Sequence, residues 1–508
     1  MSATDSTCTV LKNAHVIDPK QGLDRVTNVV ISNGRIEAIG DVDRPGAREL
    51  DLRGSYVTPG WIDGHVHTYG SIGFSDLDSI GICHGVTTMV DAGDSGIRTL
   101  DEFVALTSGT ITDIFAGPHI HPIGIIGFDN YSGRGIKDVE VERWKEWATK
   151  NPDFLRFIKV SAYSMPNGGP LYLAKGIAQE LGLPLYQHIG EFTPEPTTPC
   201  MLESVFRIAE AGDIVTHIYH NNPSRLVDDD GKVLPIVWDA ERRGVLFDIS
   251  VGGLNFSWIV AEKCFAQGLI PHIISSDLQQ YNVVYPCISL ANVMSMFLHL
   301  GMPLKDVIER VTSLPAKAMK LAHRAGSLEV GRTADITVFD VEEGEFSIDD
   351  CYRQTRKCRL KLVPKMAFKA GRQIDCDFAR GKVESNWFMQ VSEDSVPAAA
   401  ARLSQPQRAF LRSLRDALGN THWRGHTTEQ GNAGALLDVN DVYNLHDVFY
   451  RVLATHPIAL RDGAQAVLNC FLEHPFTVQI GLLLTRLDRR LVLDRLDAVT
   501  APASELVA

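Results

Sequence analysis

The stretch PGWIDGHVH, residues 59–67, decides how the rest of the chain is organised. Its two histidines, His65 and His67, are separated by one residue, and side chains on an extended strand alternate between faces with a period of two. Both imidazoles therefore project to one side and can reach one metal ion. Two polar surface residues on a strand would show the same spacing. Because the pair follows an apolar segment and a Pro-Gly turn, with more candidate ligands at strand ends downstream, the sequence predicts a metal site.

The composition is that of a large globular protein. Its 508 residues exceed the usual size of one compact core, which predicts one large domain with additions. The net charge of −13 disfavours nucleic acid and anionic membranes as partners. Residues 1–10 are polar and no run of eighteen apolar residues occurs, so we expect neither a secretory signal nor a membrane span. The nine cysteines are scattered without a CxxC pair, which is typical of free thiols in a reducing cytoplasm.

Short strand patterns occur on both sides of a long middle region. In the N-terminal part, Asn33-Gly34 between two apolar runs predicts a tight hairpin. A second β-rich piece comprises residues 335–339 and 360–369, followed by the turn Ala370-Gly371. We expect the two pieces, residues 1–58 and 326–385, to assemble one small β-sandwich.

The middle region alternates strand and helix patterns and belongs to the α/β class. Segments such as residues 141–150 and 171–180 read as helices between apolar runs of strand length. A doubly wound open sheet is the alternative, but no GxGxxG follows the first strand. Eight βα units predict a (β/α)₈ TIM barrel over residues 59–325, with an active site at the C-terminal ends of the strands. The eight runs are 61–65, 86–91, 114–118, 157–161, 185–188, 214–217, 245–249 and 272–276.

Residues 386–508 predict a mainly helical C-terminal extension. Helical patterns cover 407–418, 441–453, 463–472 and 477–496. In the last pattern apolar residues recur at three- and four-residue spacing, which is typical of an amphipathic helix that packs on a partner surface. We expect this extension to pack against the barrel or to form a homo-oligomer.

Polar side chains stand at the ends of several predicted strands. Each has an ordinary explanation: a histidine bonded within the core, a snorkelling lysine, or an aspartate that caps a helix. Together they lie on one rim of the predicted barrel, and imidazole and carboxylate are ligands that suit Zn²⁺. They are His65 and His67, Lys159, His188, His217 and Asp277.

These motifs resemble those of the amidohydrolase superfamily over about residues 7–380. The matching segments include PGWIDGHVH, GVTTMVDAG, FIKVSA, YQHIGE, VTHIYH, ISSDL and GSLEVGRTADITVFD. The resemblance implies two divalent metal ions, usually zinc, with these ligands: His65 and His67 on the first ion, His188 and His217 on the second, a CO₂-derived carbamate of Lys159 as the bridge, and Asp277 completing the first site. Carboxylation is physically reasonable, because it converts a costly buried cation into a bridging anion.

The contexts of His188 and His217 look most like a deacetylase branch related to dihydroorotases, which includes acetyl-mandelate deacetylase-like enzymes. We therefore expect hydrolysis of an amide or ester, as an N-acyl or O-acyl group of a small-molecule acid, by a hydroxide that two metal ions share. Asp277 is the expected general acid and base.

Two other functions stay open. The first is a cyclic amidohydrolase of the dihydroorotase, hydantoinase or imide-hydrolysing kind. A dihydroorotase usually has an arginine two residues after the HxH pair, and Tyr69 at that position disfavours this reading. The second is a non-catalytic scaffold homologue that binds partners through the helical extension. Weaker candidates for substrate contacts are Tyr69, His119, Tyr163 and His220.

Overall fold

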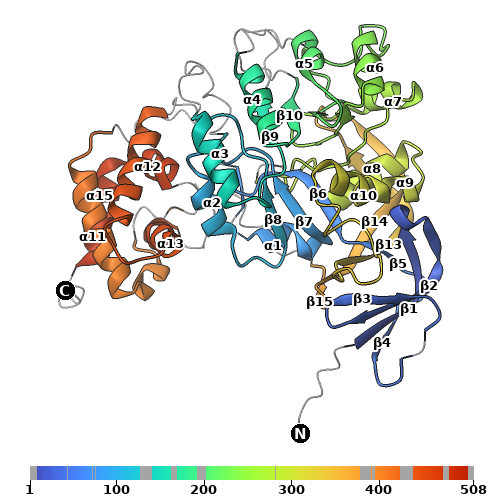
Figure 1. The fold of residues 1–508 in the computed structure, drawn as a ribbon, viewed down its shortest axis with the longest axis horizontal. Helices are drawn as coiled ribbons and strands as arrows, with labels where there is room; N and C mark the ends of the chain where they lie inside the picture. Colours follow the sequence, from blue (N-terminus) through green and yellow to red (C-terminus); the bar gives the residue numbers. More distant parts are fainter. Residues whose placement is uncertain are drawn as a thin grey trace.

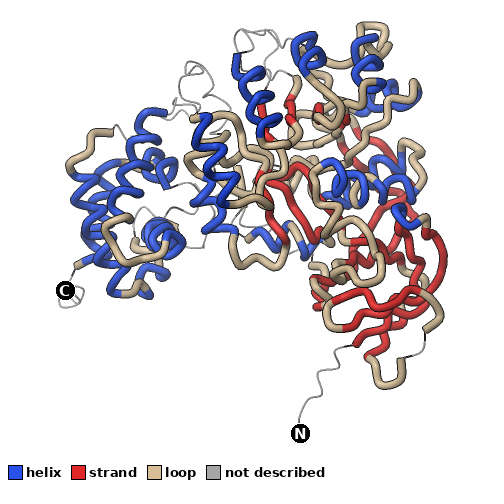
Figure 2. The backbone as a smooth tube through the Cα atoms, in the orientation of Figure 1, coloured by secondary structure: helices blue, strands red, loops and turns tan. Residues whose placement is uncertain are grey.

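The computed structural model describes most of residues 8–501. Outside the description lie residues 43, 71, 75, 126–139, 162–168, 191–201, 281, 378–390, 392–394, 424–438 and 473–479. Figure 1 shows a β-rich part, a central α/β part, and a group of C-terminal helices that lies beside α2 (Leu100–Thr107) and α3 (Val141–Lys150). Figure 2 shows the same division, with helices gathered at the C-terminal side.

The two β-rich pieces of the sequence come together in one eight-stranded sheet. Its order is β15-β14-β13-β5-β1-β2-β3, and β4 pairs with β1. The central contact is the antiparallel pairing of β13 with β5. The strands are assigned to one sheet, so the sandwich of two packed sheets stays a prediction. The strands are β1 (Cys8–Asp18), β2 (Leu23–Ser32), β3 (Arg35–Ile39), β4 (Arg48–Asp51), β5 (Tyr56–Pro59), β13 (Ile336–Asp349), β14 (Thr355–Lys369) and β15 (Arg372–Asp375), with the 3₁₀ turn η1 (Pro19–Gln21) before β2.

Both predicted hairpin turns of this sheet are present. Asn33 and Gly34 have φ of 49° and 74°, and Ala370 and Gly371 have φ of 48° and 79°. Positive φ at both central residues is what a two-residue hairpin turn of the primed type requires. The turns also touch, because a Cβ on Gly34 would lie 2.8 Å from the carbonyl oxygen of Ala370. Glycine at position 34 therefore serves both the turn and the contact.

The central part contains two parallel sheets with helices between the strands. The first sheet has the order β6-β7-β8 and the second has the order β12-β11-β10-β9. The strands are β6 (Trp61–Val66), β7 (Val86–Asp91), β8 (Asp113–Ala116), β9 (Ile158–Ser161), β10 (Leu185–His188), β11 (Ile214–Thr216) and β12 (Leu246–Phe247). The remaining helices are α1 (Leu77–Ile80), η2 (Ile82–His84), α4 (Gly169–Glu180), α5 (Leu202–Ile208), α6 (Pro235–Arg242), α7 (Trp258–Ala266), α8 (Leu290–His299), α9 (Leu304–Glu309) and α10 (Ser313–Ala318).

Seven of the eight predicted runs form strands, and the eighth does not. Residues 272–276 contribute one parallel bridge in place of a strand, Asp248 to Ile273, and a second parallel bridge follows the run, Val66 to Leu278. A further parallel bridge joins Ala116 to Leu155, between β8 and β9. The prediction of a strand at 272–276 was therefore wrong, because its backbone pairs at isolated points only. Among the described residues the strands make two open sheets that single bridges connect, without an assigned closed barrel.

The C-terminal region is helical, as its patterns predict. Its helices are η7 (Ala398–Arg402), α11 (Gln405–Gly419), α12 (Val439–Leu453), α13 (Leu460–Phe471), α14 (Ile480–Arg486) and α15 (Arg489–Thr500). The single helix predicted for 477–496 is two helices. Asp488 separates them, because its side chain accepts hydrogen bonds from the backbone N–H groups of Arg490 and Leu491 and so begins a new helix. None of the described helices has the length and apolar character that crossing a membrane requires.

A buried carboxylate joins the C-terminal helices to the central part. Glu102 of α2 is fully buried, and its Oε1 accepts hydrogen bonds from the Tyr69 hydroxyl at 2.5 Å and from the Ile480 backbone N–H at 3.1 Å. His446 of α12 approaches the other oxygen at 4.0 Å. Burial raises the pKa of Glu102 to about 7, although both hydrogen bonds act against the rise.

This raised pKa predicts a pH-dependent stability that Glu102→Gln removes. The folded protein keeps the proton that the unfolded chain has released, so stability is fully present below pH 4.5 and falls as the pH rises toward 7. One pKa unit corresponds to about 1.4 kcal/mol, so the expected loss is about 3 kcal/mol. Urea denaturation at pH 5 and pH 8 measures it. Glu203→Gln on the surface is the control, and an equal loss in wild type and Glu102→Gln would contradict the expectation.

Candidate metal centre

The predicted ligands lie together at the C-terminal ends of the parallel strands. His65 belongs to β6 and His188 ends β10, while His217 directly follows β11. All six candidates are buried, with exposed fractions of 8% or less. They are His65, His67, Lys159, His188, His217 and Asp277. The structure therefore buries all six on this side of the parallel strands, and their role as metal ligands stays a prediction.

Asp277 lies close to three histidines of the cluster. Its Oδ1 lies 3.0 Å from His67 Nε2 and 3.5 Å from His65 Nε2. Candidate ligand atoms of His65, His217 and Asp277 all lie within 4.8 Å of one another. Three buried side chains of the types that bind zinc thus converge on one point.

The backbone holds this cluster in uncommon conformations. His217 and Asp277 have φ of 68° and 52°, in the left-handed region that residues with a Cβ rarely adopt. Gly252, with φ of 58°, lies against Asp277, and a Cβ there would be 2.2 Å from the Oδ2 atom. Such conformations persist only where the surroundings impose them, and they are concentrated at functional sites.

Two further contacts orient the histidines of β10 and β11. His217 Nδ1 lies 2.8 Å from the carbonyl oxygen of Ser250, so Nδ1–H donates to that oxygen and Nε2 carries the lone pair. His217 Nε2 in turn lies 3.0 Å from His188 Nδ1. The lone pair of His217 therefore points into the cluster, as a metal ligand requires.

Lys159 lies beside these imidazoles, and no carboxylate of the described residues is in contact with its amine. Its Nζ is 3.2 Å from His65 Nε2 and 4.4 Å from the centre of the Tyr186 ring. Burial lowers the pKa of Lys159 to about 7, while the charge of Asp277 opposes the shift. A large fraction of this amine is consequently neutral, and therefore nucleophilic, at neutral pH.

Three of the four histidines and Asp277 have the protonation states that metal binding needs. Burial first, and then the charge of Lys159, lower the pKa of His65 to about 4. Burial also holds the pKa of His188 and that of His217 well below the ordinary value. Burial alone would raise the pKa of Asp277, but the neighbouring imidazoles lower it. Neutral imidazoles and an ionised carboxylate are the ligand forms of these groups.

His67 differs from the other imidazoles because two carboxylates flank it. Asp94 Oδ1 lies 2.8 Å from its Nδ1, opposite the contact that Asp277 makes with Nε2. Burial acts to lower the pKa of His67, but the two carboxylates raise it to about 10. Two anions around one imidazole favour a cation between them, which is a proton here and would be a metal ion in the loaded site.

Sequence reasoning missed the carboxylates behind the cluster. Asp94 is one, and Asp248 is the other, with its Oδ2 2.5 Å from the Tyr186 hydroxyl and 3.8 Å from His65 Nδ1. Burial would raise the pKa of Asp248, yet His65 and several hydroxyl donors lower it to about 2. Their sequence signal was their place after strands, since Asp94 lies three residues beyond β7 and Asp248 directly follows β12. Such partners orient the imidazoles that bind metal ions.

The weaker candidates have different surroundings. His119 is buried next to Lys159, to which it forms a parallel bridge, and its Nε2 lies 3.3 Å from Ser161 Oγ. His220 is buried against Gly190, where a Cβ would lie 3.0 Å from its ring. Tyr69 directs its hydroxyl to Glu102 of α2, as described above. Tyr163 lies outside the described residues. A substrate contact by any of the four stays a prediction.

A hairpin of the flanking sheet reaches the same rim. The tip between β13 and β14 places the Tyr352 hydroxyl 2.7 Å from Asn222 Oδ1 and 3.0 Å from the Leu254 carbonyl oxygen. Asp350 accepts the backbone N–H of Trp258 at 2.9 Å. Asn222 follows β11, and Leu254 and Trp258 follow β12, so this hairpin joins two loops that surround the cluster.

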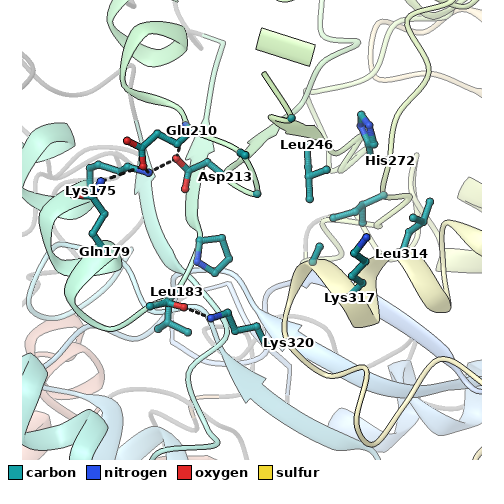
Figure 3. Close-up of a pocket in the computed structure, with 17 residues that line it drawn as sticks. Lys175, Gln179, Leu183, Glu210, Asp213, Leu246, His272, Leu314, Lys317 and Lys320 are labelled. Atoms are coloured by element: carbon teal, nitrogen blue, oxygen red, sulfur yellow. Dashed lines mark hydrogen bonds and ion pairs between the residues drawn. The ribbon is translucent and has the colours of Figure 1, made fainter. Parts of the chain in front are cut away.

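A cavity of about 610 Å³ lies at the opposite ends of the strands (Figure 3). Its polar wall contains Lys175, whose Nζ lies 2.5 Å from Asp213 and 2.9 Å from Glu210. Lys317 and Lys320 lie across from this wall (Figure 3). None of the predicted ligands lines this cavity, so it is separate from the candidate metal centre.

Comparisons with known proteins point to one family. Residues 214–382 match a family model described as the amidohydrolase family. A deacetylase of Agrobacterium fabrum is 31% identical over 352 residues, which are 67% of this chain and 85% of that protein. Solved structures of an adenine deaminase and of a dihydroorotase are each 29% identical, with a TM-score of 0.65. They cover 72% and 73% of this chain, and 99% of each of those chains is matched.

The likeness to the Agrobacterium protein extends over most of that protein and is strong enough to establish the family. The family implies a divalent metal cofactor, and the buried cluster of His65, His217 and Asp277 offers ligands for it. The chain therefore belongs to the amidohydrolase family and is a hydrolase of carbon–nitrogen or ester bonds.

Proposed function

We propose that this hydrolase is a metal-dependent deacetylase that removes an N-acyl or O-acyl group from a small-molecule acid. The observation that carries the proposal is the buried convergence of His65, His217 and Asp277, whose ligand atoms lie within 4.8 Å of one another. Similarity to a protein named deacetylase supports the reaction type.

The residues of the cluster fit a pair of divalent metal ions, most simply zinc. Three of the donors are neutral imidazoles, those of His65, His188 and His217, and Asp277 is an ionised carboxylate, which are ligands that zinc prefers. His67 would exchange its proton for the metal ion. Ions held there would supply an activated water and a polarised carbonyl at neutral pH. The proposed ligands are His65 and His67 on one ion, His188 and His217 on the other, Lys159 between them and Asp277 on the first.

Lys159 is proposed to act as a carbamate. Its neutral amine bonds to the carbon of CO₂ and loses one proton, which leaves an anionic carbamate in place of an ammonium ion. The change removes the possibility of a buried cation at a point where no carboxylate of the described residues contacts the amine, and it creates two oxygen ligands among imidazoles. The low pKa of this lysine favours the step at neutral pH.

Asp277 is proposed to transfer the proton during hydrolysis. It accepts a proton from the attacking water and returns it to the leaving amine or alkoxide. Asn255 Nδ2 and Gln279 Nε2 donate to its two oxygens, at 3.2 Å and 2.8 Å, and hold the carboxylate in place. Fixed donors of this kind keep the carboxylate oriented toward the reacting atoms.

The proposal also includes the division of the chain into a barrel, a β-sandwich and a helical extension. Single parallel bridges connect the open sheets in the order that a (β/α)₈ barrel over residues 59–325 requires. Residues 1–58 with 326–385 form the proposed β-sandwich domain, and residues 386–508 form the proposed helical extension.

A cyclic amidohydrolase is the second candidate. The likeness to a solved dihydroorotase favours it. Against it stands Tyr69, which is fully buried and bonded to Glu102, so this position presents no cation to a substrate carboxylate. The full set of ligand types at the rim disfavours a non-catalytic scaffold.

The first test compares substrate classes on metal-loaded protein. We expect hydrolysis of N-acetyl amino acids or O-acetyl hydroxy acids in preference to dihydroorotate, hydantoins and cyclic imides. Metal analysis should find two divalent ions per chain, and a chelator should abolish turnover until Zn²⁺ is restored. Turnover of ring substrates alone would overturn the deacetylase proposal.

Asp277→Asn tests the proton transfer. The amide keeps the shape and one oxygen of the carboxylate, so metal is expected to stay bound while kcat falls by about 10²–10⁴-fold. Steady-state kinetics and metal analysis check both parts, with the exposed Asp229→Asn as the control. A rate near that of wild type would contradict the assignment.

Lys159→Ala tests the carbamate. The variant should lose metal and activity, and short-chain carboxylic acids should restore part of both, because their carboxylate can replace the bridging anion. Lys317→Ala, at the opposite ends of the strands, is the control. Unchanged metal content in Lys159→Ala would show that no bridging group is formed there.

A further inference from the structure

Asn255 stands next to the proposed proton carrier in a defined orientation. It lies in the loop between β12 and α7 and is 4% exposed. Its Nδ2 donates to Asp277 Oδ2 over 3.2 Å. Because a carboxylate flanked by imidazoles acts as an acceptor, the amide must turn its NH₂ group toward Asp277. The Oδ1 atom of Asn255 is thereby directed elsewhere.

The oxygen atom of this amide, Oδ1, has no hydrogen-bond partner among the described residues. Asn255 Oδ1 is buried, and none of the described residues donates to it. A buried acceptor without a donor costs free energy, so native proteins almost always supply a partner. The oxygen belongs to the same planar amide that contacts Asp277, so it lies within a few ångströms of that carboxylate, about the reach of a hydrogen bond. A ligand at the reacting centre meets this requirement.

The loop that carries Asn255 is held on several sides. Tyr352, at the tip of the β13–β14 hairpin, approaches the carbonyl oxygen of Leu254, the residue before Asn255, at 3.0 Å. The Gly252 N–H donates to the carbonyl oxygen of Ser276, the residue before Asp277. The unpartnered oxygen is therefore presented by a supported loop, as a specificity contact requires.

We propose that Asn255 Oδ1 accepts a hydrogen bond from the N–H of the scissile amide, so that this enzyme selects N-acyl substrates whose nitrogen carries a hydrogen. The proposal rests on the proposed acyl hydrolysis and chooses between its two substrate classes. An ester places an oxygen at the same point, and its lone pairs would face Oδ1 without a proton between them. A tertiary amide would place a methyl group there.

The test pairs two substrates with three proteins. The substrates are an N-acetyl amino acid and its N-methyl analogue, which lacks the N–H. The proteins are wild type, Asn255→Leu and Gln279→Leu. Both variants remove a donor to Asp277, but Asn255→Leu alone also removes the buried acceptor. Weaker positioning of Asp277 lowers kcat/KM for both substrates equally, whereas loss of the acceptor affects only the N–H substrate.

Wild type and Gln279→Leu are expected to prefer the N–H substrate by about tenfold or more, the factor that one buried hydrogen bond supplies. In Asn255→Leu this preference should fall to near one, with metal content unchanged. Calorimetric titration of the two compounds should show the same pattern in affinity, independently of turnover.

The outcomes separate this inference from the proposed function. An unchanged preference in Asn255→Leu would overturn the assignment of Asn255. Turnover of O-acetyl acids alone would also overturn it, while the deacetylase proposal would stand. If no acylated acid is hydrolysed, the proposed function fails. The calorimetric comparison then still decides whether Asn255 accepts a hydrogen bond from the N–H group of the bound compound.

Discussion

A carboxylate that is only 2% exposed is stable where hydrogen-bond donors and positive charge surround it, and Asp277 has both. His65 and His67 approach one of its oxygens, and Asn255 and Gln279 donate to the carboxylate. This one buried anion lowers the energy of any cation placed among the imidazoles, and the backbone that carries it is left-handed at residue 277. The remaining features of the rim follow from this requirement. Glycine at 252 makes room for the carboxylate.

The rim is supported by parts of the chain that are far apart in sequence. Asp94 and Asp248 contact the imidazoles from behind, and the hairpin tip at Asp350 and Tyr352 joins the loops after β11 and β12. The C-terminal helices connect to the same region through Glu102, which links Tyr69 to the start of α14. A metal site needs ligands held to within a fraction of an ångström, and contacts from several independent elements provide that precision. The flanking sheet and the C-terminal helices are thus part of what holds the site.

Much of this could be predicted from local patterns. Seven of the eight strand runs, the hairpin turns at Asn33-Gly34 and Ala370-Gly371, and most of the C-terminal helices follow from periodicity and turn chemistry. The break at Asp488 was missed because a capping aspartate inside an apolar repeat leaves the helical spacing intact. The eighth run, residues 272–276, was mistaken for a strand because an apolar composition indicates that a segment is buried. It does not indicate whether the backbone of the segment forms hydrogen bonds with a neighbouring strand. The length of the β13–β14 hairpin was missed because its outer half is too polar to read as strand.

The sequence by itself determined which chemical groups reach the rim. The HxH spacing places two imidazoles on one face of a strand. The polar residues at the ends of the other strands reach the same side, because parallel strands all point their C-terminal ends the same way. Only the tertiary structure decided which groups surround those ligands. The carboxylates of Asp94 and Asp248, the amide of Asn255 and the hydroxyl of Tyr352 acquire their roles through contacts with residues far away in the sequence, 130 positions away in the contact of Tyr352 with Asn222. No local period encodes such contacts, because they depend on how separate loops pack and on which buried polar atoms remain to be satisfied.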